Sequence, residues 1–251
     1  DHCVTGVQTC ALPIFHNLAY QGLFPRADYA LTNLPHHYFN PDGVEFFGLM
    51  NCLKAGIAYA DSLTTVSPRY AREITTEEYG CGLDPLLRAR SAALEGVLNG
   101  VDYEEWNTTE NPHVTHPFTA SQLSGKAKMK AAVQAEFGLP ASPDVPLFVA
   151  IARIADQKGM DLLLGALEEM LHADMQFVLL GSGSPEFENA FRELPARFPG
   201  KAGVRIGFDV PLSHRMEAAA DFFLMPSRFE PCGLNQMYSL RYGAIPIVRR
   251  T

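Results

Sequence analysis

The sequence is organised around one stretch, which runs Phe222-Phe223-Leu224-Met225-Pro226-Ser227-Arg228-Phe229-Glu230-Pro231-Cys232-Gly233-Leu234-Asn235. Its first four residues form a continuous apolar run, which is typical of a strand buried on both faces. Residues 234–242, which begin at the end of this stretch, read as a helix. The stretch is therefore expected to join the carboxyl end of a strand to a helix N-terminus, where ligands bind in open α/β sheets. By itself it fits an ordinary turn with a solvated Glu230 as well as it fits a ligand site.

Strands and helices alternate strictly on either side of this stretch, over residues 121–251. Continuous apolar runs predict strands at 147–152, 177–180, 204–207, 222–225 and 244–248. Helical patterns lie between them at 160–171, 185–194, 212–220 and 234–242, and another surrounds Met129, Val133 and Phe137. This pattern indicates a parallel sheet that helices cover on both faces, which makes residues 121–251 a doubly wound α/β domain.

The first half of the chain has shorter elements. Apolar residues at helical spacing predict that residues 45–60 contain an amphipathic helix. Residues 62–66 are rich in β-formers, and Ser67-Pro68 is typical of a helix start, here of a helix that runs to residue 74. A second helix is expected over 86–94, and a short strand over 95–102 that ends in an Asn-Gly turn. Residues 14–22 read as a strand end that runs into a loop.

Two segments fall outside these patterns. Residues 1–13 show no periodicity and resemble a translated sequencing adapter, so we interpret them as a non-native leader, with a frayed natural segment as the alternative. Residues 107–120 contain prolines and a polar run without periodicity, which predicts a linker. The expected organisation is thus a first domain over 14–106, a linker, and a second domain over 121–251.

Composition excludes several classes of protein. The net charge is −8 and no basic run is present, so nucleic acid is not an expected partner. No apolar run is long enough to span a membrane, and no signal peptide is visible. The five cysteines are scattered without metal-ligand spacing, which favours reduced thiols in a cytosol-like compartment and predicts no metal site.

Three further strand ends of the second domain carry notable groups. Arg153 lies at the end of one strand and Lys158 at the start of the next helix, so an anion such as a diphosphate could bind between them. In the alternative, Asp156 caps the helix and Lys158 points to solvent. The glycine-rich residues 181–183 read as a turn first and a ligand loop second. Phe208 stands at a strand end where a base could stack, although a core aromatic is the default.

Taken together, these strand ends suit a nucleotide-diphosphate ligand that carries a neutral, hydroxyl-rich group for Glu230 to hydrogen-bond. The sequence contains no G-x-S-x-G, H-E-x-x-H or Walker motif. Glu230 also has no second carboxylate nearby in sequence, which argues against glycoside hydrolysis.

Several motifs, in this order along the chain, resemble those of bacterial glycogen synthase and plant starch synthase, the ADP-glucose-dependent α-1,4-glucan glucosyltransferases of glycosyltransferase family 5. They occupy residues 16–22, 66–68, 98–102, 153–161 and 226–234. The resemblance implies a GT-B fold, in which two Rossmann-like domains face a cleft. Residues 14–106 would then be the C-terminal part of the acceptor-side domain, and 121–251 a truncated nucleotide-sugar domain.

The resemblance also implies roles for named residues. Arg153 and Lys158 would neutralise the donor diphosphate, and Glu230 would contact the donor sugar. Backbone N–H groups near Cys232, Gly233 and Leu234 would bind the distal phosphate, Phe208 would stack on adenine, and His16 and Asn99 would touch the glucose and the reacting centre. The expected partners are ADP-glucose and an α-1,4-glucan. Transfer would retain configuration without a metal or other cofactor, in the cytoplasm or, in a plant, the plastid.

The chain departs from the family pattern at both ends. The Lys-Thr-Gly-Gly-Leu loop of the family is absent, and the chain stops at Thr251 where the family continues, so we expect an internal fragment without synthase activity of its own. Two alternatives stay open. A UDP-sugar-dependent GT-B transferase with another acceptor would share the sheet-edge groups, although many such enzymes carry a second Glu where this chain has Tyr238. A non-catalytic glucan-binding relative would keep the fold alone.

Overall fold

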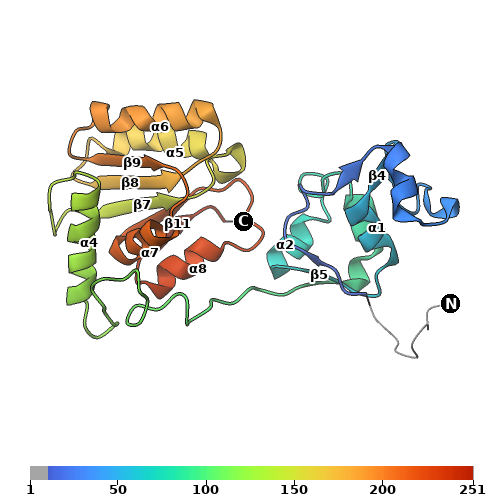
Figure 1. The fold of residues 1–251 in the computed structure, drawn as a ribbon, viewed down its shortest axis with the longest axis horizontal. Helices are drawn as coiled ribbons and strands as arrows, with labels where there is room; N and C mark the ends of the chain where they lie inside the picture. The colour runs from blue at the N-terminus through green and yellow to red at the C-terminus, as the bar shows by residue number, and fades with distance from the viewer. Residues whose placement is uncertain (1–10, 251) are drawn as a thin grey trace. The chain divides into compact units, whose positions relative to one another are not determined.

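The structure, a computed structural model, describes residues 11–250 and divides the chain into two compact units, Asp1–Asn99 and Gly100–Thr251 (Figure 1). Residues 1–10 of the predicted leader lie outside the described residues. The backbone N–H of Ala11 donates to the Asp61 carboxylate at 2.8 Å. The carbonyl of Pro13 accepts from the Thr64 N–H at 3.0 Å. Residues 11–13 are therefore hydrogen-bonded to the first unit.

The second unit is a doubly wound α/β domain, as predicted. Its strands all run parallel in the order β11-β10-β7-β8-β9. They are β7 (Leu147–Ile151), β8 (Gln176–Gly181), β9 (Ala202–Ile206), β10 (Phe222–Met225) and β11 (Ile245–Val248). The helices are α4 (Ser124–Glu136), α5 (Met160–Met170), α6 (Pro185–Arg197), α7 (Val210–Ala219) and α8 (Leu234–Arg241). The elements predicted for this unit are confirmed to within three residues at their ends.

Both faces of the middle strands of this sheet are covered, which explains their continuous apolar sequences, whereas the edge strand β11 is mostly exposed. On β7, Val149 packs into a core shared with α4, α7 and the end of α8, whereas Ala150 packs into a core shared with α5 and α6. Both side chains are almost fully buried, because successive residues of a strand point to opposite faces. Figure 1 shows α5 and α6 on one side of the sheet and α4, α7 and α8 on the other.

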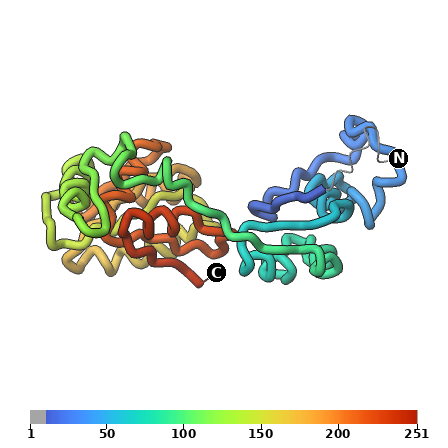
Figure 2. The backbone as a smooth tube through the Cα atoms, turned by 90° about the horizontal axis from the view of Figure 1, so that it is seen from below, coloured from blue at the N-terminus to red at the C-terminus, as the bar shows by residue number. Residues whose placement is uncertain are grey.

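The segment predicted as a linker packs against the second unit. Just before it, the Trp106 ring stacks on Tyr238 of α8 with 3.7 Å between ring centroids. Asn111 Nδ2 donates to the Tyr242 hydroxyl at 3.1 Å, and Val114 and Phe118 belong to the core that α4 and α7 share. Figure 2 shows this segment, in green, running beside α8, in red. It therefore packs as part of the second unit and contributes to its core.

The first unit holds two small sheets. One is parallel, in the order β1-β5-β6, and the other is antiparallel, in the order β2-β4-β3. The strands are β1 (Ile14–Phe15), β2 (Leu23–Phe24), β3 (Glu45–Phe46), β4 (Leu49–Asn51), β5 (Leu63–Thr65) and β6 (Leu94–Gly96). The helices are α1 (Cys52–Tyr59), α2 (Pro68–Glu73) and α3 (Asp84–Ala89), and 3-10 turns occupy Arg26–Thr32, His36–Tyr38 and Ser91–Ala93.

The helix predicted within 45–60 is confirmed as α1, and two other predictions for this unit need correction. Before α1, Phe47 and Gly48 have φ of 51° and 83° and form the turn of a β3–β4 hairpin. The helix begins only after Asn51, whose side chain accepts from the Lys54 N–H. The helix over 86–94 ends at Ala89 and continues as a 3-10 turn, and the strand over 95–102 is confined to Leu94–Gly96. The predicted helix start at Ser67 is confirmed.

Within residues 11–250, no helix combines the length and the apolar character needed to cross a membrane.

Candidate active site

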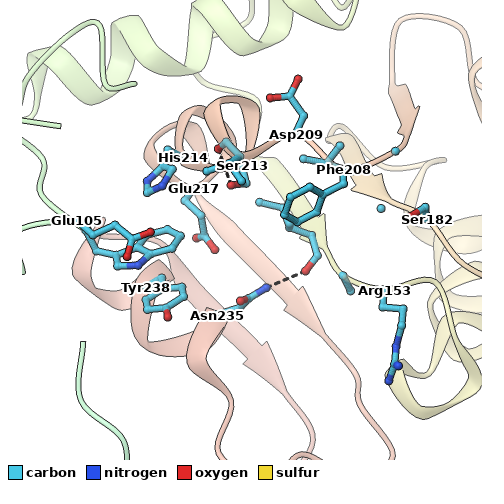
Figure 3. A pocket seen from close by; sticks show the side chains of 17 residues that line it. Glu105, Arg153, Ser182, Phe208, Asp209, Ser213, His214, Glu217, Asn235 and Tyr238 are labelled. Carbon is cyan, nitrogen blue, oxygen red and sulfur yellow. Dashed lines mark hydrogen bonds between the residues drawn. The ribbon is translucent and has the colours of Figure 1, made fainter. Parts of the chain in front are cut away.

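A pocket lies at the carboxyl edge of the five-stranded sheet. Because the strands run parallel, the loops after β7, β8 and β9 meet at this edge, and with α7, α8 and residues 105–106 they enclose about 430 Å³. The lining consists of Glu105, Trp106, Ile151, Ala152, Arg153, Leu180, Gly181, Ser182, Gly207, Phe208, Asp209, Val210, Ser213, His214, Glu217, Asn235 and Tyr238 (Figure 3). Its volume is within the range of small-molecule sites.

Two of the predicted site residues, Arg153 and Phe208, line this pocket from neighbouring strand ends. Arg153 follows β7, and its exposed guanidinium donates to Gln157 Oε1 at 2.9 Å. Phe208 follows β9, and 91% of its surface is exposed, so it is not a core aromatic. An aromatic ring at the edge of a pocket offers a face on which a base can stack.

Lys158 and Glu230 form an ion pair, although they are 72 residues apart in sequence. Lys158 Nζ lies 2.6 Å from Glu230 Oε2, and Ser227 Oγ donates to the same oxygen at 3.0 Å. Neither expectation for Lys158, an anion or solvent, included this partner. The alternative that Asp156 caps the helix is wrong, since the N-cap of α5 is Gly159 and no side chain caps it.

Two contacts hold the loop after β10 against the start of α5. Gly159 has φ of 66°, and a Cβ added there would lie 2.3 Å from the carbonyl oxygen of Pro226, so only glycine allows this approach. Arg228 donates to both carboxylate oxygens of Asp161 at 2.7 Å each. These hydrogen bonds lower the pKa of Asp161 to about 2. The loop that carries Glu230 is therefore fastened to the turn that carries Lys158.

The N-terminus of α8 follows this loop. Gly233 is its N-cap, with φ of 81°, and no side chain caps the helix. Such a helix start presents backbone N–H groups and a positive dipole end to an anion. Cys232, Gly233 and Leu234 do not line the pocket, and neither do Lys158 and Glu230. The next residue, Asn235, belongs to the lining and donates to the Ile151 carbonyl at 2.8 Å.

The remaining predicted residues, His16 and Asn99, belong to the first unit. His16 directly follows β1 and is exposed, and Asn99 follows β6 and is half-buried. Their strands flank β5 in a parallel sheet, so both residues leave the same carboxyl edge of that sheet.

The sequence reasoning missed a group of side chains at the inner end of the pocket. Trp106 stacks on His214 as well as on Tyr238, with 4.2 Å between the Trp106 and His214 ring centroids. Glu217 lies one turn after His214 on α7, and both side chains are buried. Two ionisable residues on the inward face of a mostly apolar helix were the available signal, since such residues are rarely buried without a role.

Burial shifts the protonation of this inner group. It raises the pKa of Glu217 well above its ordinary value, with nearby Lys126 opposing the shift. It lowers the pKa of His214 to about 4, aided by His113, and that of Lys126 to about 8. Among residues 11–250, no three His, Cys, Asp or Glu side chains are grouped so that they could hold a metal ion.

Comparison with known proteins matches each half of the chain to a different family model. Residues 6–89 match the family described as "Starch synthase catalytic domain", and residues 145–251 match "Glycosyl transferases group 1". The chain is 56% identical over 249 residues to the glycogen synthase of Anaeromyxobacter sp. (strain Fw109-5), which covers 99% of this chain and 52% of that protein. It is 53% identical over 250 residues to that of Myxococcus xanthus (strain DK1622), which covers 98% of this chain and 52% of that protein.

Solved structures agree with these matches. The catalytic domain of starch synthase IV from Arabidopsis thaliana, bound to ADP and acarbose, superposes with a TM-score of 0.91 at 36% identity, covering 96% of this chain and 50% of that chain. A glycosyltransferase from Rickettsia africae ESF-5, 17% identical with a TM-score of 0.56, shares the fold.

The parallel sheets, the sheet-edge pocket and these matches define a glycosyltransferase of the GT-B type. Over nearly its whole length the chain is similar to bacterial glycogen synthases and to a plant starch synthase. It spans about half the length of the relatives it matches, 52% in the case of the Anaeromyxobacter sp. protein.

Proposed function

We propose that this chain contributes the donor site of a synthase that transfers glucose from ADP-glucose to the non-reducing end of an α-1,4-glucan. The observation that carries the proposal is the pocket that Arg153 and Phe208 line beside the N-terminus of α8. A cation, an aromatic face and a helix start are the groups that a nucleoside diphosphate requires. The starch synthase structure 36% identical to this chain was solved with ADP and acarbose, which supports this ligand class.

In the proposed complex, Arg153 and Lys158 neutralise the diphosphate, and backbone N–H groups near Cys232, Gly233 and Leu234 bind its distal phosphate. Phe208 stacks on the base. Glu230 contacts the donor sugar and is paired with Lys158. The proposed role of His16 and Asn99 is to touch the glucose and the reacting centre.

The proposed reaction retains the configuration of the glucose and uses neither a protein nucleophile nor a metal. The acceptor hydroxyl attacks on the face that the diphosphate leaves, and the leaving phosphate oxygen takes the acceptor's proton. Negative charge develops on the diphosphate as the bond between the glucose and the diphosphate oxygen breaks. Fixed positive groups stabilise that charge without reorganising, which lowers the barrier. Arg153, Lys158 and the α8 N-terminus would supply this stabilisation.

Calorimetric titration of the 251-residue chain with ADP, ADP-glucose and UDP tests the proposal. Saturable binding of ADP and ADP-glucose, each at least about tenfold tighter than UDP, is the expected result, a difference of about 1.4 kcal/mol. If UDP binds more tightly than ADP, the ADP-glucose proposal is wrong and the UDP-sugar-dependent alternative takes its place. A chain that binds a maltooligosaccharide but neither nucleotide would be a glucan-binding relative.

A further inference from the structure

Glu217 is a buried acid for which the proposed reaction has no use. Its side chain lies on α7 and is 1% exposed. Among the residues that the structure describes, its Oε2 atom is the buried side-chain oxygen or nitrogen without a hydrogen-bond partner. Buried polar atoms without partners are rare in folded proteins because each loses its hydration with nothing in return.

The cation that acts on this carboxyl group, Lys126, does not satisfy it. Lys126 lies close enough to oppose the pKa shift of Glu217. Its ammonium group, however, donates to the carbonyls of Ala218 and Tyr242 at 3.0 Å each. No ion pair joins Lys126 to Glu217 among the contacts of the described residues. An ordinary buried ion pair therefore does not account for Glu217.

The carboxyl group instead points into the pocket. Glu217 belongs to the lining, and Figure 3 shows its carboxyl on the side where Tyr238 and Asn235 lie. The same pocket has Phe208 and Arg153 on its outer side. A ligand whose phosphates lie near Arg153 would thus place its nucleoside within the pocket, where the unpartnered oxygen is available.

We propose that Glu217 accepts a hydrogen bond from the nucleoside of the donor, and so acts as a specificity-determining residue of the pocket. The inference rests on the proposed function. The chemistry required is an N–H or O–H donor, which a ribose hydroxyl or the exocyclic amine of the base can supply. A site that hydrogen-bonds such a group rejects the analogue that lacks it, since its own polar group is then left unpaired.

The chain offers a built-in reporter for the test. Trp106 is the single tryptophan of the sequence, and it lines the pocket next to Tyr238. Its fluorescence can follow titrations with ADP, 2′-deoxy-ADP, 3′-deoxy-ADP, inosine diphosphate and inorganic diphosphate. The variants are Glu217→Leu, which removes the acceptor, Glu217→Gln, which keeps one, and Glu193→Gln, on an exposed residue of α6, as the control.

Glu217→Leu is expected to weaken ADP binding about tenfold or more, whereas Glu217→Gln and Glu193→Gln stay within about threefold of the unchanged chain. For the analogue that lacks the bonded donor, and for inorganic diphosphate, Glu217→Leu makes no difference. The analogue whose binding is unaffected by Glu217→Leu identifies the group that Glu217 bonds. If it is a deoxy compound, that group is a ribose hydroxyl; if it is inosine diphosphate, that group is the amine of the base.

Two results would overturn the inference: unchanged ADP binding by Glu217→Leu, or an equal loss for every probe, diphosphate included, which indicates a structural role. Failure of the proposed function is distinguishable, because the unchanged chain would then not bind ADP at all. Thermal unfolding of each variant shows whether it is folded.

Discussion

The Lys158 ammonium and the Glu230 carboxylate lie 2.6 Å apart, and both side chains are mostly shielded from solvent. This ion pair joins the turn before α5 to the loop after β10. It places a cation and a carboxylate side by side next to the N-terminus of α8. A diphosphate bound there would share Lys158 with Glu230, and the sugar attached to it would lie next to the carboxylate.

Glu230→Gln separates these two effects. The carboxylate competes with the diphosphate for Lys158 and repels its charge, so its removal is expected to tighten ADP binding about threefold, or about 0.7 kcal/mol. Binding of ADP-glucose should gain less, because the amide is a weaker partner for the sugar hydroxyls. Calorimetric titration of the unchanged chain and of Glu230→Gln with ADP and with ADP-glucose gives the change in affinity for each ligand. A loss of ADP affinity would show that Glu230 supports the phosphate site rather than competing with it.

Gly159→Ala tests the close approach of the two loops. The residue has a left-handed φ, and the new Cβ would lie 2.3 Å from the Pro226 carbonyl oxygen, so a loss of about 2–3 kcal/mol in the free energy of unfolding is expected. The control is Gly165→Ala, in the middle of α5, where a Cβ meets nothing within 4 Å and a gain of about 0.5–1 kcal/mol is expected. Urea unfolding of the unchanged chain and of both variants measures the two changes in unfolding free energy. Equal effects at the two sites would contradict the packing described.

Arg228→Lys addresses the clamp on Asp161. Lysine cannot donate to both carboxylate oxygens at once, so the loop after β10 loses its bidentate contact. Because both side chains are partly exposed, a loss of less than about 1 kcal/mol in unfolding free energy is expected. ADP binding should weaken by a few-fold as the Glu230 loop loosens. Arg192→Lys, which alters an ion pair within α6, is the control and should leave ADP binding unchanged.

Acid destabilisation through His214 follows from its burial. The His214 ring stacks on Trp106, and its Nδ1 accepts from Asn111 Nδ2 at 3.1 Å, so the folded protein holds it neutral. Its pKa falls from 6.5 to about 4. Below pH 6.5 the unfolded chain binds a proton that the folded chain does not. The stability that the neutral ring contributes is therefore present above pH 6.5 and lost as the pH falls towards 4, by about 3 kcal/mol in total.

The difference in unfolding free energy between the unchanged chain and His214→Gln, measured from pH 7 to pH 4, isolates this contribution from that of the carboxylates. The difference should shrink as the pH falls. His172→Gln, at an exposed residue after α5, should show no such trend. A pH-independent difference for His214→Gln would mean that the ring is not held neutral.

Much of the second unit was predictable because burial on both faces leaves a plain mark in the sequence. Every residue from Phe177 to Leu180 is buried, which is what a continuous apolar run requires. Arg153 and Phe208 could be placed in one pocket because parallel strands end at one edge. In the first unit, the helical spacing of apolar residues over 45–60 gave no sign of the hairpin before α1, because its turn depends on left-handed backbone at Phe47 and Gly48.

The contacts between distant segments could not be predicted in the same way. The interpretation of Lys158 used only its neighbours along the chain, whereas its partner Glu230 comes from a loop 72 residues away. Residues near Trp106 lack periodicity, yet the ring stacks on Tyr238 in the lining. Such contacts depend on how separate segments pack, which a single sequence does not encode in its spacing.

The most direct test of the donor site is a titration of the 251-residue chain with ADP, compared across Lys158→Ala and Lys128→Ala. Both variants remove one lysine, but Lys128 is exposed on α4. We expect saturable binding that Lys158→Ala weakens at least about tenfold, or about 1.4 kcal/mol, and that Lys128→Ala leaves within about twofold. Equal affinities for the two variants, or no saturable binding by the unchanged chain, would contradict the account.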